Sequence, residues 1–333
     1  MTGFHISQKK NFGYVLLMVL VLMTVIATAL TTIATRSLQT TQEAVMAVEQ
    51  FQQRVGLASC QKTFLPRADG IFKSLEEINK NTKKGTKPLR QPMVGESIVL
   101  SGQRFDLVLS DENAKVNLNR MYHLVGLEKV NQELQKKLSI DEFQALRLRP
   151  AVPSQSANQA REKVAGQSKK PIDKSNVSDP AASTTETEEL VQPAFRSWGE
   201  VFDFARLSSQ RPDERVQLEF TKLFTLWGAG QVNIERASDE SVRTIVELIL
   251  PPARANVIVT KLRENEVMGI QSVLEFEAGT YEEKKGLSSL LGKYSFAYSL
   301  FVDATSPQCR SRKLFVEAVD SSGVLQMSEF VFH

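Results

Sequence analysis

The longest apolar pattern in the chain is an uncharged run from Tyr14 to Ala34, which follows two lysines and Gly13. A helix of about 21 residues is roughly 31 Å long, close to the hydrocarbon thickness of a bilayer. The run is too long for the apolar region of a cleaved secretory signal. It predicts one membrane span. Because the lysines precede the span, residues 1–11 are expected in the cytoplasm and the chain after Arg36 outside it.

The apolar positions beyond Arg36 recur every three or four residues, which keeps one seam on one side of a helix. The helix from Tyr14 to Leu65 would have about 52 residues and a length of roughly 78 Å, with Gly56 or Pro66 as its end. The seam expected to meet partner helices consists of Val45, Val48, Phe51 and Val55.

Two short strands are expected at Ile98–Leu100 and Phe105–Leu109, separated by a turn at residues 101–102. The preceding segment, Pro66–Gly95, is polar and basic, and its KNTKKGTKP stretch predicts an exposed loop. The segment Asp111–Asn119 (DENAKVNLN) follows the second strand and predicts a β-turn.

A helical pattern covers Met121–Leu148, with a capping box formed by Ser139 and Glu142. Between Pro150 and Pro193 the apolar periodicity disappears, and the Ser, Thr, Pro, Lys and Glu content predicts a disordered insertion. The helical pattern resumes at Ser197–Leu207, so the insertion is not expected to be a domain boundary.

The segment Leu223–Arg263 predicts a pair of helices. A strand-like run ends in the Trp-Gly-Ala-Gly stretch 227–230, before a helix capped by Ser238 or Asp239. That helix should stop at Leu250 because two prolines follow, and a second helix should run to about Glu264.

The C-terminal part of the chain predicts strands. Ile270–Phe276 is expected to begin a β-rich tail, and residues 320–323 (Asp-Ser-Ser-Gly) to form a hairpin turn. Alternating apolar positions predict half-buried strands at Tyr294–Val302, Lys313–Val319 and Val324–Phe332.

Composition sets bounds on the protein class. A chain of 333 residues with 42% hydrophobic content is long enough for an anchor and one or two compact domains. The net charge of +3 is too mild to demand a nucleic-acid partner. Cys60 and Cys309 could pair as a disulfide outside the cytoplasm or stay as two thiols, and both alternatives are open.

Candidate chemistry is sparse. His5, His123 and His333 have no second candidate ligand nearby, and no nucleophile, Walker or dinucleotide motif occurs. Neither an enzyme nor a cofactor is therefore predicted. Four glutamates could contribute to a calcium site, but two adjoining lysines favour a solvated loop. These glutamates are Glu275, Glu277, Glu282 and Glu283.

The N-terminal pattern resembles that of type IV pilins and type II secretion pseudopilins. In those families a short basic leader ends in glycine and is removed by prepilin peptidase, and the new N-terminus is methylated. The resemblance implies a cut between Gly13 and Tyr14. The fifth mature position is Met18, where the family pattern has a glutamate. Absence of that glutamate is typical of the K-type minor pseudopilin (the general secretion pathway protein K family), which caps the pseudopilus.

Two external motifs are similar to the K-type family. Asp111–Asn119 resembles a segment of the form acidic-x-x-G-K-hydrophobic-N-hydrophobic-N, with Ala114 where that family often has glycine. The stretch after residue 227 resembles a G-x-G-x-I-N entry to paired helices. There Asn233 and Ala237 match, while Glu235-Arg236 stand where the family usually has Asn-Thr.

The resemblance implies an α+β fold: a long N-terminal transmembrane helix and a pilin-like antiparallel sheet interrupted by an inserted α-helical domain. The implied divisions are a leader (1–13), a spine helix (14–65), a first β part (66–120), a helical insertion (121–275) and a second β part (276–333). It also implies a single-pass inner-membrane protein with a periplasmic domain. The implied partners are other minor pseudopilins, the prepilin peptidase and the inner-membrane secretion platform. The implied role is assembly at the pseudopilus tip, with structural calcium an open alternative.

A DNA-uptake or type IV pilus minor pilin is the alternative, with the paired helices as a helix–hairpin–helix-like DNA-binding unit. Such a hairpin needs free N–H groups close to the phosphate. Pro251 has no N–H, Leu250 is bulky, and Gly228 and Gly230 lie too far before the helix to serve. The cations this alternative would use are Arg254, Lys261 and Arg263.

Overall fold

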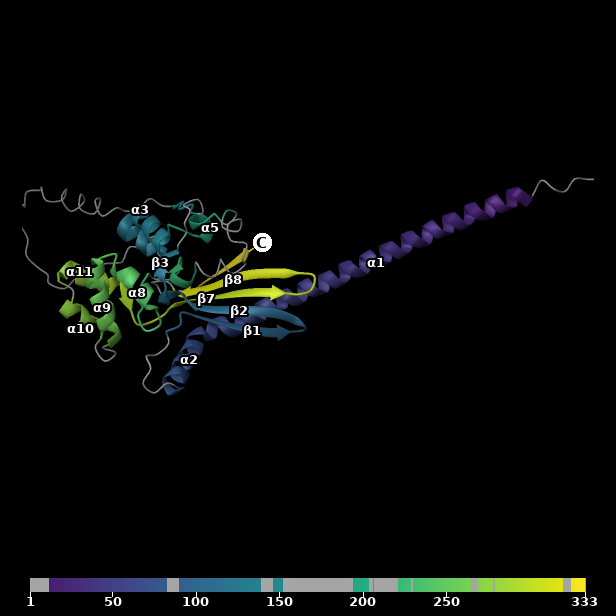
Figure 1. The fold of residues 1–333 in the computed structure, drawn as a ribbon. Helices are drawn as coiled ribbons and strands as arrows, with labels where there is room; N and C mark the ends of the chain where they lie inside the picture. The colour runs from purple at the N-terminus through teal and green to yellow at the C-terminus, as the bar shows by residue number, and fades with distance from the viewer. Residues whose placement is uncertain are drawn as a thin grey trace, which may run out of the picture.

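The computed structural model describes residues 12–82, 90–138, 146–151, 194–203, 206, 221–228, 230–264, 269–277, 279–319 and 325–332. Helix α1 (Phe12–Phe64) spans 53 residues without interruption. It passes through Gly56 and ends where Pro66 enters the short 3₁₀ turn η1 (Leu65–Arg67). Figure 1 shows α1 as a rod whose N-terminal half projects far beyond a compact head. The predicted long helix is confirmed.

Five antiparallel strands form one sheet in the order β1-β2-β7-β8-β9. The turn between β1 and β2 has Ser101 at φ 51° and Gly102 at φ 78°, so both central residues are left-handed, as a two-residue hairpin requires. The predicted break at these two residues is confirmed. The strands are β1 (Met93–Leu100), β2 (Gln103–Asp111), β7 (Ala297–Thr305), β8 (Arg310–Val319) and β9 (Leu325–Phe332).

The outer half of α1 packs on one face of this sheet. Leu57 and Cys60 are buried against alternate residues of the strands, among them Phe105 and Leu300. A Cβ placed on Gly56 would lie 2.3 Å from Cζ of Phe105, so only glycine lets the helix approach the sheet this closely. We call this the inner face of the sheet.

Everything between β2 and β7 forms a second, mainly helical region with its own core, drawn from residues 114–291. Strands β2 and β7 are neighbours in the sheet, so the helical region is inserted between adjacent strands. This confirms the expected α+β fold with an inserted helical region, and the helical core extends beyond 121–275 at both ends.

The helices of this region are α3 (Leu118–Leu138), α5 (Trp198–Val201), α8 (Asp239–Val246), α9 (Pro252–Glu264), α10 (Ile270–Glu277) and α11 (Tyr281–Leu290). Short pairs are β3 (Val116–Asn117) with β4 (Phe224–Thr225), and β5 (Val232–Asn233) with β6 (Leu291–Gly292), while η2 (Glu112–Ala114) precedes β3.

The expected strand at Ile270–Phe276 is wrong, because this segment is helix α10. Ile270, Val273 and Leu274 are 8%, 3% and 1% exposed, whereas Phe276 is 77% exposed. The spacing of the three buried residues is that of one helix face. A short apolar run does not by itself distinguish a strand from a helix, and here contact with the helical core decides.

Helix α2 (Ala68–Thr82) occupies part of the segment described as polar and basic, Pro66–Gly95, for which no helix was predicted. It forms because Phe72 is buried and Ile71 packs at the edge of the same core, so one face of a mostly polar segment is covered. Figure 1 shows α2 running away from the end of α1 at the side of the head. Most of the expected loop KNTKKGTKP lies outside the described residues.

Two predicted helices are shorter than expected. Helix α3 ends at Leu138 and is kinked at Gly126 (φ 81°), and Leu148 is not helical, with φ 42°. Helix α5 ends at Val201, because Phe202 forms an antiparallel bridge with Leu146. The capping box at 139 and 142, the insertion after residue 151 and the turn 320–323 lie outside the described residues.

Candidate functional site

The exposed surface of α1 is the first candidate site. Val45, Val48, Phe51 and Val55 are 42%, 55%, 67% and 49% exposed. Gln53, on the sheet side, is 2% exposed. At about 100° per residue, Phe51 and Val55 each lie roughly 160° around the helix from Gln53. Phe51 and Val55 therefore face away from the sheet of their own chain, as Val48 does at roughly 140° from Gln53.

The N-terminal half of α1 is long and apolar enough to cross a membrane, and none of its most apolar window is buried within the protein. Gly13 and Tyr14 lie in its first turn, and Met18 is 63% exposed. The threonines in this half donate hydrogen bonds to carbonyls one turn earlier, as Thr28 does to Val25 and Thr31 to Ala27. Satisfied hydroxyls can be accommodated in an apolar environment.

The second candidate site is the segment Asp111–Asn119, which we call the polar hub. Its polar side chains are between 0% and 8% exposed. They are Asp111, Glu112, Asn113, Lys115, Asn117 and Asn119. Buried polar groups are costly unless they are paired, so this concentration needs many partners.

The hub side chains bind backbone from distant parts of the chain. The Asn113 Oδ1 accepts from the N–H groups of Phe296 and Ala297 at 2.9 Å. The Asn119 side chain accepts from Phe195 N–H at 2.7 Å and donates to the Leu226 carbonyl at 2.9 Å. The hub thus ties the start of β7 and two segments of the helical region to the end of β2.

Glu112 and Lys115 form an ion pair of 2.8 Å in which both side chains are 1% exposed. The remaining oxygen positions of Glu112 accept hydrogen bonds from the hydroxyls of Thr225 and Ser299. Both carboxylate oxygens of Glu112 therefore accept hydrogen bonds, which offsets part of the cost of burying the charge.

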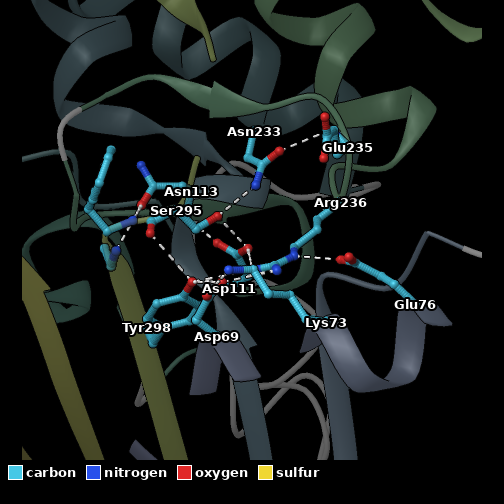
Figure 2. Close-up of polar contacts among 12 residues, drawn as sticks. Asp69, Lys73, Glu76, Asp111, Asn113, Asn233, Glu235, Arg236, Ser295 and Tyr298 are labelled. Carbon is cyan, nitrogen blue, oxygen red and sulfur yellow. Dashed lines mark hydrogen bonds and ion pairs between the residues drawn. The ribbon is translucent and has the colours of Figure 1, made fainter. Parts of the chain in front are cut away.

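Arg236 joins the helical region to α2 and to the sheet, as Figure 2 shows. Its Nε donates to Glu76 at 2.6 Å, and its Nη2 to Asp69 at 3.1 Å, both on α2. Its Nη1 donates to Asp111 Oδ2 and to the Tyr298 hydroxyl, each at 3.2 Å. Four residues from three elements, α2, β2 and β7, therefore contact one guanidinium.

Burial and the charge of Arg236 shift the pKa values of the acidic groups in this cluster. Burial raises the pKa of Asp111, and the hydroxyl of Ser295 and the charge of Arg236 only partly offset it. For Asp69 burial also raises the pKa, but hydrogen bonds from Lys73, Tyr298 and Arg236 outweigh it and lower the pKa overall. Burial raises the pKa of Tyr298 above its usual range.

The two glycines after Trp227 are required by the backbone conformation and by close packing. Gly228 has φ 90° and Gly230 has φ 79°. A Cβ on Gly230 would lie 2.9 Å from the Cβ of Arg120, and one on Gly228 would lie 3.2 Å from the Cβ of Ala297. Both positions need glycine to pack against neighbouring elements of the head, not to approach a ligand.

The cations proposed for DNA binding are all engaged. Arg254 makes two hydrogen bonds of 3.0 Å to Glu283, and Lys261 pairs with Glu277. Arg263 is 5% exposed and donates to Asp239 at 2.8 Å. Phosphate binding would have to break these pairs, so the helix pair offers no free basic stripe.

The glutamates considered for calcium lie on helices α10 and α11, not on a loop. Glu283 also accepts from the N–H of Thr280 in a capping box. Among the described residues no group of three or more His, Cys, Asp or Glu side chains is arranged to hold a metal ion. His123 packs edge-on against Tyr122, and His5 and His333 lie outside the described residues.

Both cysteines are thiols in the structure. The Cys309 carbonyl accepts from the Gln53 side chain at 3.0 Å, and Gln53 lies seven residues before Cys60 on α1. Cys60 is buried and Cys309 is partly exposed.

Sequence reasoning noted Arg236 only as a departure from a family pattern, and it missed Asp69 and Glu76. One signal was available. These two carboxylates are seven residues apart, on one face of a helix that also carries Phe72. Because the polar and basic composition of Pro66–Gly95 did not predict a helix there, that shared face was not evident.

The chain is thus an α+β protein in which a long, exposed apolar helix packs through its second half on an antiparallel sheet, with a helical region inserted between neighbouring strands. Among solved structures it is similar to a chain in the crystal structure of the GspK-GspI-GspJ complex from the enterotoxigenic Escherichia coli type 2 secretion system. The identity is 14%, the match covers 87% of this chain and 99% of that chain, and the TM-score is 0.40. No protein-family model and no curated protein matches the chain.

Proposed function

We propose that this protein is a minor pseudopilin of a type II secretion system, anchored in the inner membrane with its head in the periplasm. The observation that carries the proposal is α1: its first half is fully exposed and apolar, and its second half is fixed to the head. None of the described residues covers the membrane half of this helix, so we infer that its role is assembly with other helices. No turnover is implied, and the protein is not an enzyme.

The tip of the pseudopilus is the position we propose. In the family resembled, a glutamate at the fifth mature position pairs with the N-terminal amine of a neighbouring subunit. Met18 stands at that position here, so this subunit has no carboxylate there to neutralise the amine of a subunit beyond it. A terminal place in the filament, where it helps to initiate assembly, fits that absence.

Leader removal by prepilin peptidase belongs to the same proposal. Cleavage between Gly13 and Tyr14 would leave the apolar run at the new N-terminus and remove the basic residues. Mass spectrometry of the membrane form should then show an N-methylated Tyr14 as the first residue. An intact Met1 terminus in a host with active prepilin peptidase contradicts the proposal.

The seam supplies the direct test. Val48 and Phe51 are exposed and face away from the sheet, and burial of one such side chain against a partner is worth roughly 1.5–3 kcal/mol. Replacing both with lysine should abolish co-purification with other minor pseudopilins and block secretion, while the thermal unfolding of the head stays unchanged.

The matched control adds the same charge to exposed glutamines about two and a half turns nearer the membrane, Gln39→Lys with Gln42→Lys. These positions lie on the opposite side of the helix, and we expect co-purification to persist. If the seam lysines leave both co-purification and secretion intact, the assembly role is wrong.

A further inference from the structure

The inner face of the sheet is only partly covered by α1. In the row that runs across β7 and β8, Leu300 and Phe315 are 0% and 2% exposed. In the next row toward the end of β8, Tyr298 on β7 is still buried but Met327 on β9 is not, and one row further Phe296 and Leu325 are both exposed. Four apolar residues there form what we call the β8–β9 strip: Phe296, Val319, Leu325 and Met327.

The members of the strip are adjacent on one face. Leu325 pairs with Val319, and the Val319 N–H donates to the Phe296 carbonyl at 2.8 Å. Phe296, Leu325 and Met327 are 49%, 51% and 55% exposed. Because directly opposed residues share a face, they form a continuous apolar surface beside the part that α1 covers.

The width of the uncovered part suits one helix. Two strands at about 4.8 Å each give roughly 10 Å, which is the diameter of a helix with its side chains. A second helix lying beside α1 would therefore complete the cover of the inner face.

A carboxylate within the strip adds a charge requirement. Glu317 pairs with Met327 across β8 and β9 and is half-buried. Burial raises the pKa of Glu317, and no cation among the described residues pairs with it. A partner that covers the strip must bring a positive charge to this position, or it buries an unpaired carboxylate, which is strongly unfavourable.

We propose that the β8–β9 strip docks the amphipathic N-terminal helix of a different pilin-like subunit, with the apolar stripe of that helix on the strip and a lysine or arginine against Glu317. Helix α1 shows that such helices combine these features, since Arg54 stands beside Phe51 and Val55 on its exposed side. A second copy of this chain is disfavoured, because a head-to-tail self-contact would propagate into a filament and not end one. This inference rests on the proposed function.

Photo-crosslinking tests the partner. The full chain carries p-benzoylphenylalanine in place of Met327 and is expressed in the membrane with the other pilin-like subunits of its host. Crosslinked peptides should map to the amphipathic half of the N-terminal helix of a different pilin-like subunit. The same probe at Val99, which is 70% exposed on the opposite edge strand, should give no such product. Crosslinks to a second copy of this chain, or no crosslink to any pilin-like helix, overturn the inference.

Charge exchange tests Glu317. Glu317→Lys should lower the crosslink yield at Met327 at least tenfold, and replacing the facing cation of the partner with glutamate should restore it. Glu96→Lys, on the exposed inner side of β1, is the matched control and should change nothing. If the seam lysines block assembly while changes in the strip are harmless, only this inference fails. If neither has an effect, the proposed function fails as well.

Discussion

Arg236 Nη1 lies 3.2 Å from Asp111 Oδ2, and this contact joins the turn before α8 to the last residue of β2. Asp111 is 0% exposed and the Arg236 side chain 7% exposed. The pair therefore lies in the interior, at the boundary between the sheet and the helical region. Its position makes it the connection through which the head is held against α2.

Removal of Arg236 should be strongly destabilising. Arg236→Met keeps much of the side-chain volume but leaves Asp111 buried without its cation, which typically costs about 3–5 kcal/mol. Urea unfolding of the full chain in detergent measures the loss. Arg104→Met is the control, because its pair with Asp106 is exposed and such pairs contribute about 0.2–1 kcal/mol. Equal effects of the two substitutions would show that the cluster is not a structural centre.

Gly56 should not tolerate any side chain. Gly56→Ala places a methyl group against the ring of Phe105, which is 1% exposed, so α1 or the strand must shift. Overpacking of this kind costs about 1–3 kcal/mol. Gly70→Ala, on α2 with nothing near its Cβ position, should be neutral or stabilising by about 0.5–1 kcal/mol. Thermal unfolding of both variants, compared with the wild type, measures these effects. A Gly56→Ala protein as stable as the wild type would contradict the packing of α1.

Asp69 and Asp111 should respond to pH in opposite directions, although both contact Arg236. The pKa of Asp69 is lowered on folding, so its stabilisation is complete above about pH 3.8 and is lost as the pH falls through the folded value. The pKa of Asp111 is raised, so its stabilisation is present below about pH 3.8 and is lost as the pH rises through the folded value.

Unfolding free energies at several pH values test this contrast. The advantage of the wild type over Asp69→Asn should grow as the pH rises toward 3.8 and then stay level. Its advantage over Asp111→Asn should shrink as the pH rises above 3.8. Two curves that move in the same direction would refute the assignment.

The two cysteines should behave as independent thiols. Cys60 is 1% exposed, and burial raises its pKa, so it should react with iodoacetamide only after unfolding. Cys309 is partly exposed and should react in the native protein. Mass spectrometry without reductant counts the labels, and an unlabelled protein in denaturant, two hydrogens lighter than the dithiol, would show that a disulfide forms instead.

The sequence alone determined the features that depend on local pattern. The uncharged run after Gly13 and the spacing that follows it fix α1, because a helix of this length satisfies its own backbone and needs no tertiary contact to form. Alternation predicted strands at 294–302 and 313–319, which overlap β7 and β8 with shifted ends. Ser238 and the two prolines predicted the paired helices α8 and α9, although α8 ends at Val246 and not at Leu250. The hub was visible as a motif, although its burial was not.

Tertiary structure decided what depends on contacts between distant segments. Ile270–Phe276 carries too few residues for its period to show, and packing against the helical core made it helical. Helix α2 is mostly polar, and its contacts with the head are made by Phe72 and by carboxylates that bind Arg236. Arg236 lies 160 residues from Glu76 in the chain. The placement of Glu317 among uncovered apolar residues follows from strand register and from which half of the sheet α1 covers. Local propensity carries no information on the position of α2 or on the placement of Glu317, because contacts between segments remote in sequence determine both.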